Sequence, residues 1–196
     1  MVDLVTTLPP TFTTKVARRL GVHPRDLYAW RDSGQIIELS RGVFRRRDAA
    51  LASYPDALAV THRAPRAIVC CLSAASMHDL TDELPVSVHI AVPKHTYVPK
   101  INYPPTTVFQ FDRDTFELGL STAEAAPGEP IRVYDVARTV VDLMRLRHRF
   151  GEPIAYSALR RFLVRPDARP ALVLDYARAL GVFGPVRAAL DVASAQ

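Results

Sequence analysis

Residues 14–34 read TKVARRLGVHPRDLYAWRDSG, and this stretch decides the fold of the amino-terminal region. Val16 and Leu20 lie four residues apart, a spacing that places both apolar side chains on one face of a helix. Gly21 can adopt the left-handed conformation that ends a helix, and Pro24 suits the first position of the next helix. The stretch therefore predicts a short helix, a tight turn and a second helix.

The second helix is amphipathic, and a hairpin follows it. At 100° per residue, Leu27 and Trp30 fall on one face. The opposite face carries Arg25, Tyr28, Ala29 and Asp32. Residues 35–47, QIIELSRGVFRRR, predict two short strands joined by a turn at Ser40-Arg41-Gly42. With a first helix drawn from about residues 2–8, this order predicts a winged helix-turn-helix.

Positive charge is concentrated in the same region. The chain has 196 residues and a formal net charge of +5, with a pI of about 9.5. Residues 1–47 hold nine Lys/Arg and four Asp/Glu, whereas residues 48–196 hold sixteen of each. Such an asymmetry is typical of a module that binds a polyanion, joined to a neutral module with another role.

The rest of the chain predicts a second, larger α+β module. We expect a winged-helix domain over residues 1–50 and a second domain over 51–196. The second domain should contain a small sheet at about 86–134 and a helical region at 135–193. The expected elements begin with a core strand or the start of a helix at 67–72 and a helix over 73–80 capped by Ser73. Strands are expected at 86–92, 106–111, 116–120 and 131–134, with a loop at 93–105. One helix is expected from the Asp135 cap to Gly151, and further helices at about 154–164, 171–181 and 184–193.

Several classes of protein are disfavoured by the sequence. No apolar run is long enough to span a bilayer, and no signal peptide is evident, so we expect a cytoplasmic protein with no membrane partner. The cysteines Cys70 and Cys71 are adjacent, a spacing that suits neither a disulfide nor a zinc site. We expect two buried free thiols.

The basic residues of the winged helix are the candidates for DNA binding. In this fold the second helix enters the major groove, and the flanking helix and the wing contact phosphates. Arg25 could read guanine, Tyr28 could contact a phosphate or a thymine methyl group, and Arg41 could enter the minor groove. The candidate residues are Lys15, Arg18, Arg25, Tyr28, Arg31, Arg41, Arg45 and Arg46.

The second module offers weaker candidates. His78 and Asp79 are adjacent, which would place them on different faces of a helix, so we favour a structural histidine over an acid–base or metal site. Arg138 and Asp142 have the spacing of a helical ion pair, and we expect a pair at the surface in preference to one that holds a partner surface. No nucleophile elbow or Gly-rich phosphate loop is present. We therefore expect no catalytic residue, bound metal or cofactor.

Four stretches together resemble the AbiEi family of antitoxins, which are also transcriptional regulators. They are VARRLGVHPRDLYAWRDSGQI, ELSRGVFRR, CLSAASMHDLTDELPVSVHIAVP and VYDVARTVVDLMRLR, within residues 14–149. The resemblance implies an amino-terminal winged helix that binds inverted repeats in the operon's own promoter and represses it. It also implies a carboxy-terminal domain that counters a toxin of nucleotidyltransferase fold encoded next door, directly or functionally.

The resemblance also assigns residues. The positions that match the family's DNA contacts are Lys15, Arg18, Arg25, Tyr28, Arg41 and Arg45. For the antitoxin motif, the matching positions are His78, Asp79, Arg138 and Asp142. Self-association on the DNA is compatible with inverted repeats, and the resemblance leaves the oligomeric state open.

Two other functions stay open at the level of the sequence. One is a one-component winged-helix regulator whose carboxy-terminal domain senses a small ligand. The other is a nuclease that uses His78, Asp79 and Asp82 around a metal ion. Neither has a supporting motif.

Overall fold

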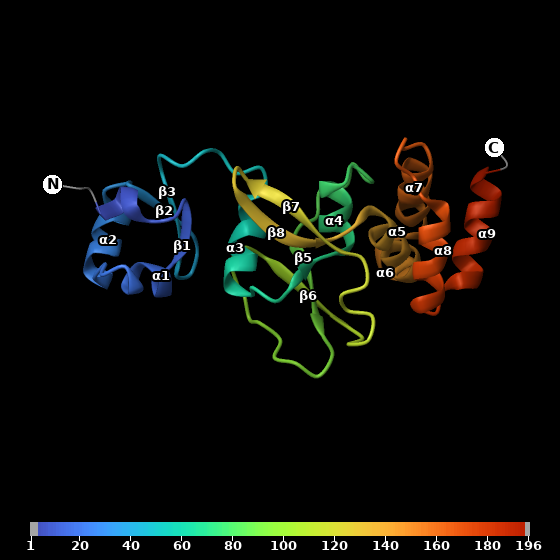
Figure 1. Cartoon of the computed structure of the whole chain (residues 1–196), viewed down its shortest axis with the longest axis horizontal. Helices are drawn as coiled ribbons and strands as arrows, with labels where there is room; N and C mark the ends of the chain where they lie inside the picture. The colour runs from blue at the N-terminus through green and yellow to red at the C-terminus, as the bar shows by residue number, and fades with distance from the viewer. Residues whose placement is uncertain (1–3, 195–196) are drawn as a thin grey trace. The chain divides into compact units, whose positions relative to one another are not determined.

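The computed structural model describes residues 4–194, and the fold is mixed α+β with two sheets (Figure 1). The contacts divide the chain into two compact units. The first runs up to residue 66 and adds 99–106 and 124–131; the second contains 67–98, 107–123 and the chain from 132 onward. The expected domain border near residue 50 stays a prediction.

The amino-terminal elements confirm the winged helix-turn-helix. Their bounds are η1 Leu4–Thr7, β1 Thr11–Thr13, α1 Thr14–Arg19, α2 Pro24–Asp32, β2 Ile36–Ser40 and β3 Val43–Arg46. The expected first helix is a four-residue 3₁₀ helix in its described part, and residues 2 and 3 lie outside the described residues. Strand β1 was not predicted. It pairs antiparallel with β3, placing Phe12 opposite Phe44, so the sheet order is β1-β3-β2.

Local caps and a small core hold these helices. The Thr13 hydroxyl accepts a hydrogen bond from the Val16 N–H at 3.3 Å at the start of α1. The His23 Nδ1 accepts one from the Arg25 N–H at 3.2 Å at the start of α2. Buried apolar side chains from every element of the winged helix pack together beneath the helices: Val5, Leu8, Phe12, Ala17, Val22, Leu27, Ile36 and Phe44.

Helix α3, Pro55–Arg63, follows the wing and belongs to the first unit. It packs against β2 and β3. The segment 99–106 also belongs to this unit, and the Ser40 hydroxyl donates to the Tyr103 carbonyl at 2.7 Å. The wing hairpin is therefore supported by chain segments well outside residues 1–50.

The second sheet has the order β6-β5-β4-β8-β7. Its strands are β4 Ile68–Val69, β5 Val88–Pro93, β6 Thr106–Phe111, β7 Leu120–Ala126 and β8 Glu129–Tyr134. The short central strand β4 pairs antiparallel with β5 and parallel with β8. The strand expected at 116–120 is wrong, because that segment is mostly turn and the strand begins only at its last residue.

Helix α4, Cys71–Met77, begins two residues before the predicted start. Cys70 occupies the cap position, so the prediction that Ser73 caps the helix is wrong. The Ser73 hydroxyl instead accepts the His89 N–H of β5 at 2.9 Å. Cys70 and Cys71 are buried and free, as predicted.

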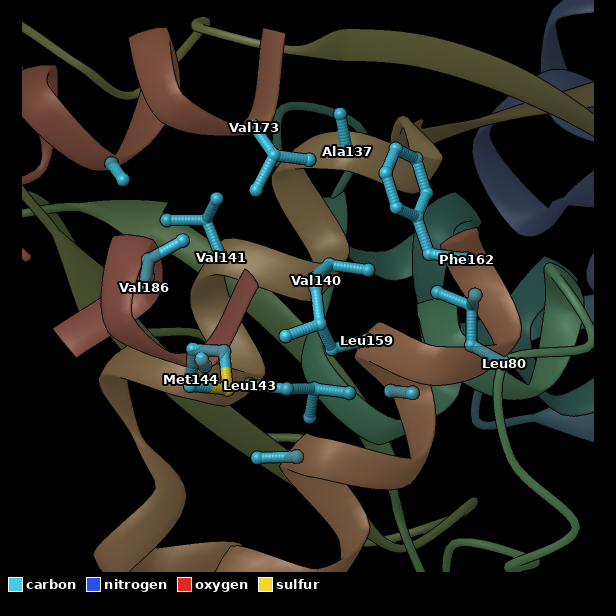
Figure 2. Packing of buried hydrophobic residues seen from close by; sticks show 14 of the residues in the cluster. Leu80, Ala137, Val140, Val141, Leu143, Met144, Leu159, Phe162, Val173 and Val186 are labelled. Atoms are coloured by element: carbon cyan, nitrogen blue, oxygen red, sulfur yellow. The ribbon is translucent and has the colours of Figure 1, made fainter. Parts of the chain in front are cut away.

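The carboxy-terminal helices are α5 Val136–Arg145, α6 Arg147–Phe150, α7 Glu152–Leu163, α8 Pro170–Ala179 and α9 Phe183–Ser194, and they lie side by side around α5 (Figure 1). Asp135 caps α5 by accepting the Arg138 N–H at 2.7 Å. Figure 2 shows Val140, Val141 and Leu143 of α5 packed among side chains of its neighbours. Within residues 4–194, no helix is long and apolar enough to cross a membrane.

Candidate nucleic-acid interface

The outward face of α2 agrees with the predicted helical periodicity. Leu27 is buried in the core and Trp30 packs against that core. On the opposite face Tyr28 is 53% exposed, and Arg25, Ala29 and Asp32 are exposed as well. The helix therefore presents a cation, an aromatic ring and a small residue to solvent, which suits insertion into the major groove.

The wing turn is held against the start of α1. Gly42 has a φ of +74°, a left-handed conformation that favours glycine. Its carbonyl accepts the Thr14 N–H at 2.9 Å. A Cβ added at Gly42 would lie 3.2 Å from the Thr14 Oγ1. This close approach fixes the turn that carries the exposed side chain of Arg41.

One carboxylate joins the wing to α2. The Glu38 Oε1 accepts the Gly42 N–H at 3.1 Å, and its Oε2 accepts from the Arg31 Nη1 at 3.3 Å. Arg31 also pairs with Asp32 at 2.9 Å and lies over the Tyr28 ring at 5.0 Å. Its pKa is raised, first by the hydrogen bond that it donates to Asp32 and then by the one that it donates to Glu38. Arg31 is thus partly occupied in holding α2 against the wing.

Five exposed cations of the two motif helices and the wing turn have no side-chain partner. Within residues 4–194, none of their side chains makes a hydrogen bond or an ion pair. Four of them come from the two motif helices and one from the wing turn: Lys15, Arg18, Arg19, Arg25 and Arg41. An open hollow of about 520 Å³ is lined by Thr14, Lys15, Arg18 and Arg19. These free charges are available to phosphates.

Arg45 and Arg46, by contrast, are engaged inside the first unit. Arg45 is only 6% exposed, pairs with Glu129 at 2.5 Å, and also donates to the Thr11 hydroxyl and the Ala50 carbonyl. Arg46 pairs with Asp48 at 2.5 Å and donates to the Leu8 carbonyl at 2.9 Å. Their guanidinium groups are committed to protein partners, so we leave both out of the proposed DNA surface.

Two cations outside the predicted set join the region. Arg19 adds to the exposed cations of α1, and its place in the sequence directly after Arg18 could have indicated it. Arg63 of α3 donates to the Arg41 carbonyl at 2.7 Å. Nothing in the sequence signals Arg63, because its position depends on how α3 packs against the wing.

His78 and Asp79 lie beyond the end of α4 instead of within it. His78 is the C-cap residue, and its Nε2 donates to the Tyr134 carbonyl at 2.7 Å. Burial lowers the pKa of His78, and the Tyr134 hydrogen bond opposes that shift. Asp79 is exposed with a φ of 57°. These contacts agree with a structural histidine, and Asp82 is paired with Arg161.

The Arg138–Asp142 ion pair forms as predicted, but the expectation that it lies at the surface is wrong. Both side chains are 0% exposed, and the Arg138 Nε donates to the Asp142 Oδ2 at 3.0 Å. Arg138 also donates to the carbonyls of Thr115 and Leu118. A Cβ at Gly119 would meet the Arg138 Cβ at 2.6 Å. The pair therefore anchors the 115–119 turn to α5.

Aromatic rings complete this buried cluster. The Arg138 guanidinium lies 4.3 Å from the Tyr134 ring centre, and that of Arg145 lies 4.5 Å from the Phe111 ring centre. Arg145 also pairs with the Asp142 Oδ1 at 2.9 Å. Burial raises the pKa of Asp142, while the two guanidinium groups oppose the rise. Cation–π contact and charge pairing compensate the burial of Arg138, and Arg145 lies partly exposed at the edge of the cluster.

No group of three or more His, Cys, Asp or Glu side chains is arranged to hold a metal ion within the described part of the chain. Two members of the triad considered for a nuclease have other partners. His78 is bonded to a backbone carbonyl and Asp82 to an arginine.

Comparison with known proteins adds family information for the amino-terminal region. Residues 3–47 match a family model described as "Transcriptional regulator, AbiEi antitoxin". None of the curated proteins matches the chain. Among solved structures, the chain is similar to the RV2827C protein from Mycobacterium tuberculosis, with a TM-score of 0.55 and 14% identity, over 96% of this chain and 78% of that one. At that identity the likeness concerns the fold alone. The sequence similarity to AbiEi antitoxins and transcriptional regulators therefore covers residues 3–47, the winged-helix segment.

Proposed function

We propose that the protein is the antitoxin of a toxin–antitoxin operon and represses its own promoter by binding DNA through the winged helix. The observation that carries the proposal is the set of five exposed cations without side-chain partners, Lys15, Arg18, Arg19, Arg25 and Arg41. The match of residues 3–47 to an AbiEi model supports a regulatory role.

In the proposed complex, α2 lies in the major groove with its exposed face toward the bases. Arg25 reads guanine, and Ala29 allows the helix backbone to approach closely. The cations of α1 contact phosphates and set the register of the protein on the duplex. Arg41 reaches the minor groove from the wing turn. Arg31 acts mainly through its hydrogen bonds to carboxylates. The bond to Asp32 lies within α2, and the bond to Glu38 of β2 holds α2 against the wing.

The antitoxin half of the proposal concerns a toxin of nucleotidyltransferase fold encoded by the neighbouring gene. We propose that the protein neutralises this toxin without an enzymatic activity of its own. Burial of the Arg138–Asp142 pair and the bond from His78 to a backbone carbonyl support this view. Side chains committed in this way hold the fold together and are poorly placed for acid–base chemistry on a substrate.

DNA binding is tested by a mobility-shift titration on the DNA upstream of the gene, with the full chain and the variants Arg25→Ala and Arg41→Ala. Both side chains are exposed and unpaired, so the fold should be unaffected. Loss of one base or phosphate contact should weaken binding by about tenfold. Arg187→Ala, which removes an exposed arginine of the second unit, is the matched control. Unchanged affinity in both winged-helix variants would reject this surface.

Neutralisation is tested separately by cell growth. The neighbouring gene is expressed with and without the full chain, and growth should be restored only when the chain is present. A ligand-sensing regulator would not restore growth, so that outcome would favour the one-component alternative and remove the antitoxin role.

A further inference from the structure

The segment 99–106, PKINYPPT, lies beside the wing turn, although Tyr103 is 63 residues from Ser40 in the chain. The segment belongs to the same compact unit as the winged helix. Ser40 is only 2% exposed, and its hydroxyl donates to the Tyr103 carbonyl at 2.7 Å. Because Ser40 directly precedes Arg41, this bond places the segment next to the part of the wing that is proposed to contact DNA.

Buried residues anchor the segment and leave its polar side chains in solvent. Ile101 is 8% exposed and Pro104 is buried. Between and before them, Tyr103 is 65% exposed, and Lys100 and Asn102 are exposed as well. The segment is therefore held to the protein at several points, and it presents an ammonium group and two uncharged hydrogen-bond donors.

The positive charge of this segment is not compensated by the protein. Residues 84–111 contain two lysines and no Asp or Glu. Lys94 pairs with Asp112 at 3.8 Å, whereas the Lys100 side chain has no hydrogen bond or ion pair within residues 4–194. The hydroxyl of Tyr103 also lacks a partner in the described part of the chain. Both groups are available to an external acceptor.

Acidic side chains near the wing are already paired. The Glu38 carboxylate accepts hydrogen bonds from α2 and from the wing turn, and Glu129 pairs with Arg45. On the same turn, Arg63 of α3 donates to the Arg41 carbonyl at 2.7 Å and so adds positive charge. Unpaired cations beside paired acids give the charge pattern that a phosphate backbone complements.

We infer that the segment 99–106 contacts the phosphate backbone of duplex DNA beside the wing, with Lys100 and the Tyr103 hydroxyl each on a phosphate oxygen. Lysine binds phosphate as a point charge, and tyrosine hydroxyls are among the donors that proteins use for phosphate oxygens. The inference rests on the proposed function, because it extends the same DNA surface beyond the winged helix. Contacts of this kind hold the protein on the duplex without reading its sequence.

The test is fluorescence anisotropy of the full chain over a salt series, on the DNA upstream of the gene and on a random duplex of equal length. Lys100→Ala should weaken binding to both duplexes by the same factor. It should also reduce by about 1 the magnitude of the slope of the log binding constant against log salt, a contribution that adds to that of the α1 cations. Lys100→Arg keeps the charge and should retain the affinity and the slope.

Tyr103→Phe removes only the hydroxyl group. It should weaken binding roughly threefold to tenfold and leave the salt slope unchanged, because no charge is lost. Arg187→Ala and Tyr156→Phe are the matched controls, since each removes the same kind of group from the second unit. Both controls should bind as the full chain does.

Other results overturn the inference, and Arg25→Ala and Arg41→Ala show how much falls with it. If those two variants weaken binding while Lys100→Ala keeps the affinity and slope of the full chain, the winged helix binds DNA without this segment. If none of the variants changes binding, the proposed DNA surface fails as a whole. A loss in Lys100→Ala confined to the upstream DNA would assign Lys100 to base reading and would contradict the phosphate contact.

Discussion

At the scale of single residues, the structure separates arginines that the sequence cannot tell apart. Arg41 and Arg45 lie in one basic segment, yet Arg41 is exposed and unpaired while Arg45 is 6% exposed and bonded to Glu129. The partner of Arg45 lies 84 residues away. No local pattern reports such a pairing, so the sequence predicts where the cations gather but not which remain free.

His89 provides a prediction about stability and pH. Its ring packs against Phe109 and Phe150, and burial, followed by the charge of Arg149, lowers its pKa to about 4. The unfolded imidazole binds a proton near pH 6.5, whereas the folded one does so only near pH 4. The unfolded state therefore holds more protons in that window, and the free energy of unfolding should fall as pH falls through it, by about 3 kcal/mol.

Urea unfolding at neutral pH and near the acid end of this window measures the effect. His89→Phe keeps an aromatic ring and should flatten the pH dependence, although burial also lowers the pKa of His62 and His78, so part of the slope should remain. His148→Phe, at an exposed position, is the control and should leave the slope unchanged. An unaltered slope in His89→Phe would show that this imidazole is not the source.

At the scale of elements, local signals predicted the motif helices and the hairpin strands and missed β1 and β7. Pro24 and the glycines at 21 and 34 bracket α2 within the sequence itself. Strand β1 has three residues and exists because it pairs with β3 more than thirty residues away. Strand β7, LSTAEAA, is rich in alanine, which has a low intrinsic preference for strands. Pairing with the neighbouring strand β8 overrides that preference.

The wing turn yields a prediction at this scale. Gly42→Ala should destabilise the chain by roughly 1–2 kcal/mol, because a side chain at positive φ is strained and its Cβ would press on the Thr14 Oγ1 at 3.2 Å. DNA affinity should fall as well, since Arg41 would be displaced. Thermal unfolding and a mobility shift measure the two effects.

Gly128→Ala is the matched control for the wing turn. Gly128 has the same φ of +74°, but its added Cβ would meet nothing within 4 Å. Its stability cost should be smaller, because it arises from backbone strain alone, and DNA affinity should be retained. Equal loss of affinity in the two variants would mean that the geometry of the wing turn is not what matters for binding.

At the scale of the whole molecule, charge distribution predicted the modular organisation, and packing determined the rest. The excess of cations in residues 1–47 is visible in the sequence and corresponds to the winged helix. The groove of about 700 Å³ lined by residues of α7 and α9 cannot be seen in the sequence, because it arises from how these two helices pack around α5. A pattern of apolar residues predicts each helix and leaves its neighbours undetermined.

Salt dependence provides the prediction for the whole molecule. With Lys15, Arg18 and Arg19 on phosphates, the log of the DNA-binding constant should fall with the log of salt concentration at a slope of about −3 per protomer. The double variant Lys15→Ala/Arg18→Ala should reduce the magnitude of this slope by about 2. Fluorescence anisotropy over a salt series measures it. A slope that the double variant leaves unchanged would exclude α1 from phosphate contact.

The two hydrogen bonds that the Glu38 carboxylate accepts have a kinetic consequence. One carboxylate accepts hydrogen bonds from both the Gly42 N–H and the Arg31 guanidinium in the DNA-free protein. In the proposed complex, α2 and the wing turn would therefore meet the DNA already aligned. Diffusion and long-range attraction should then set the rate of encounter, with no slow folding step. Discrimination between operator and random sequence should consequently lie in how long the complex lasts.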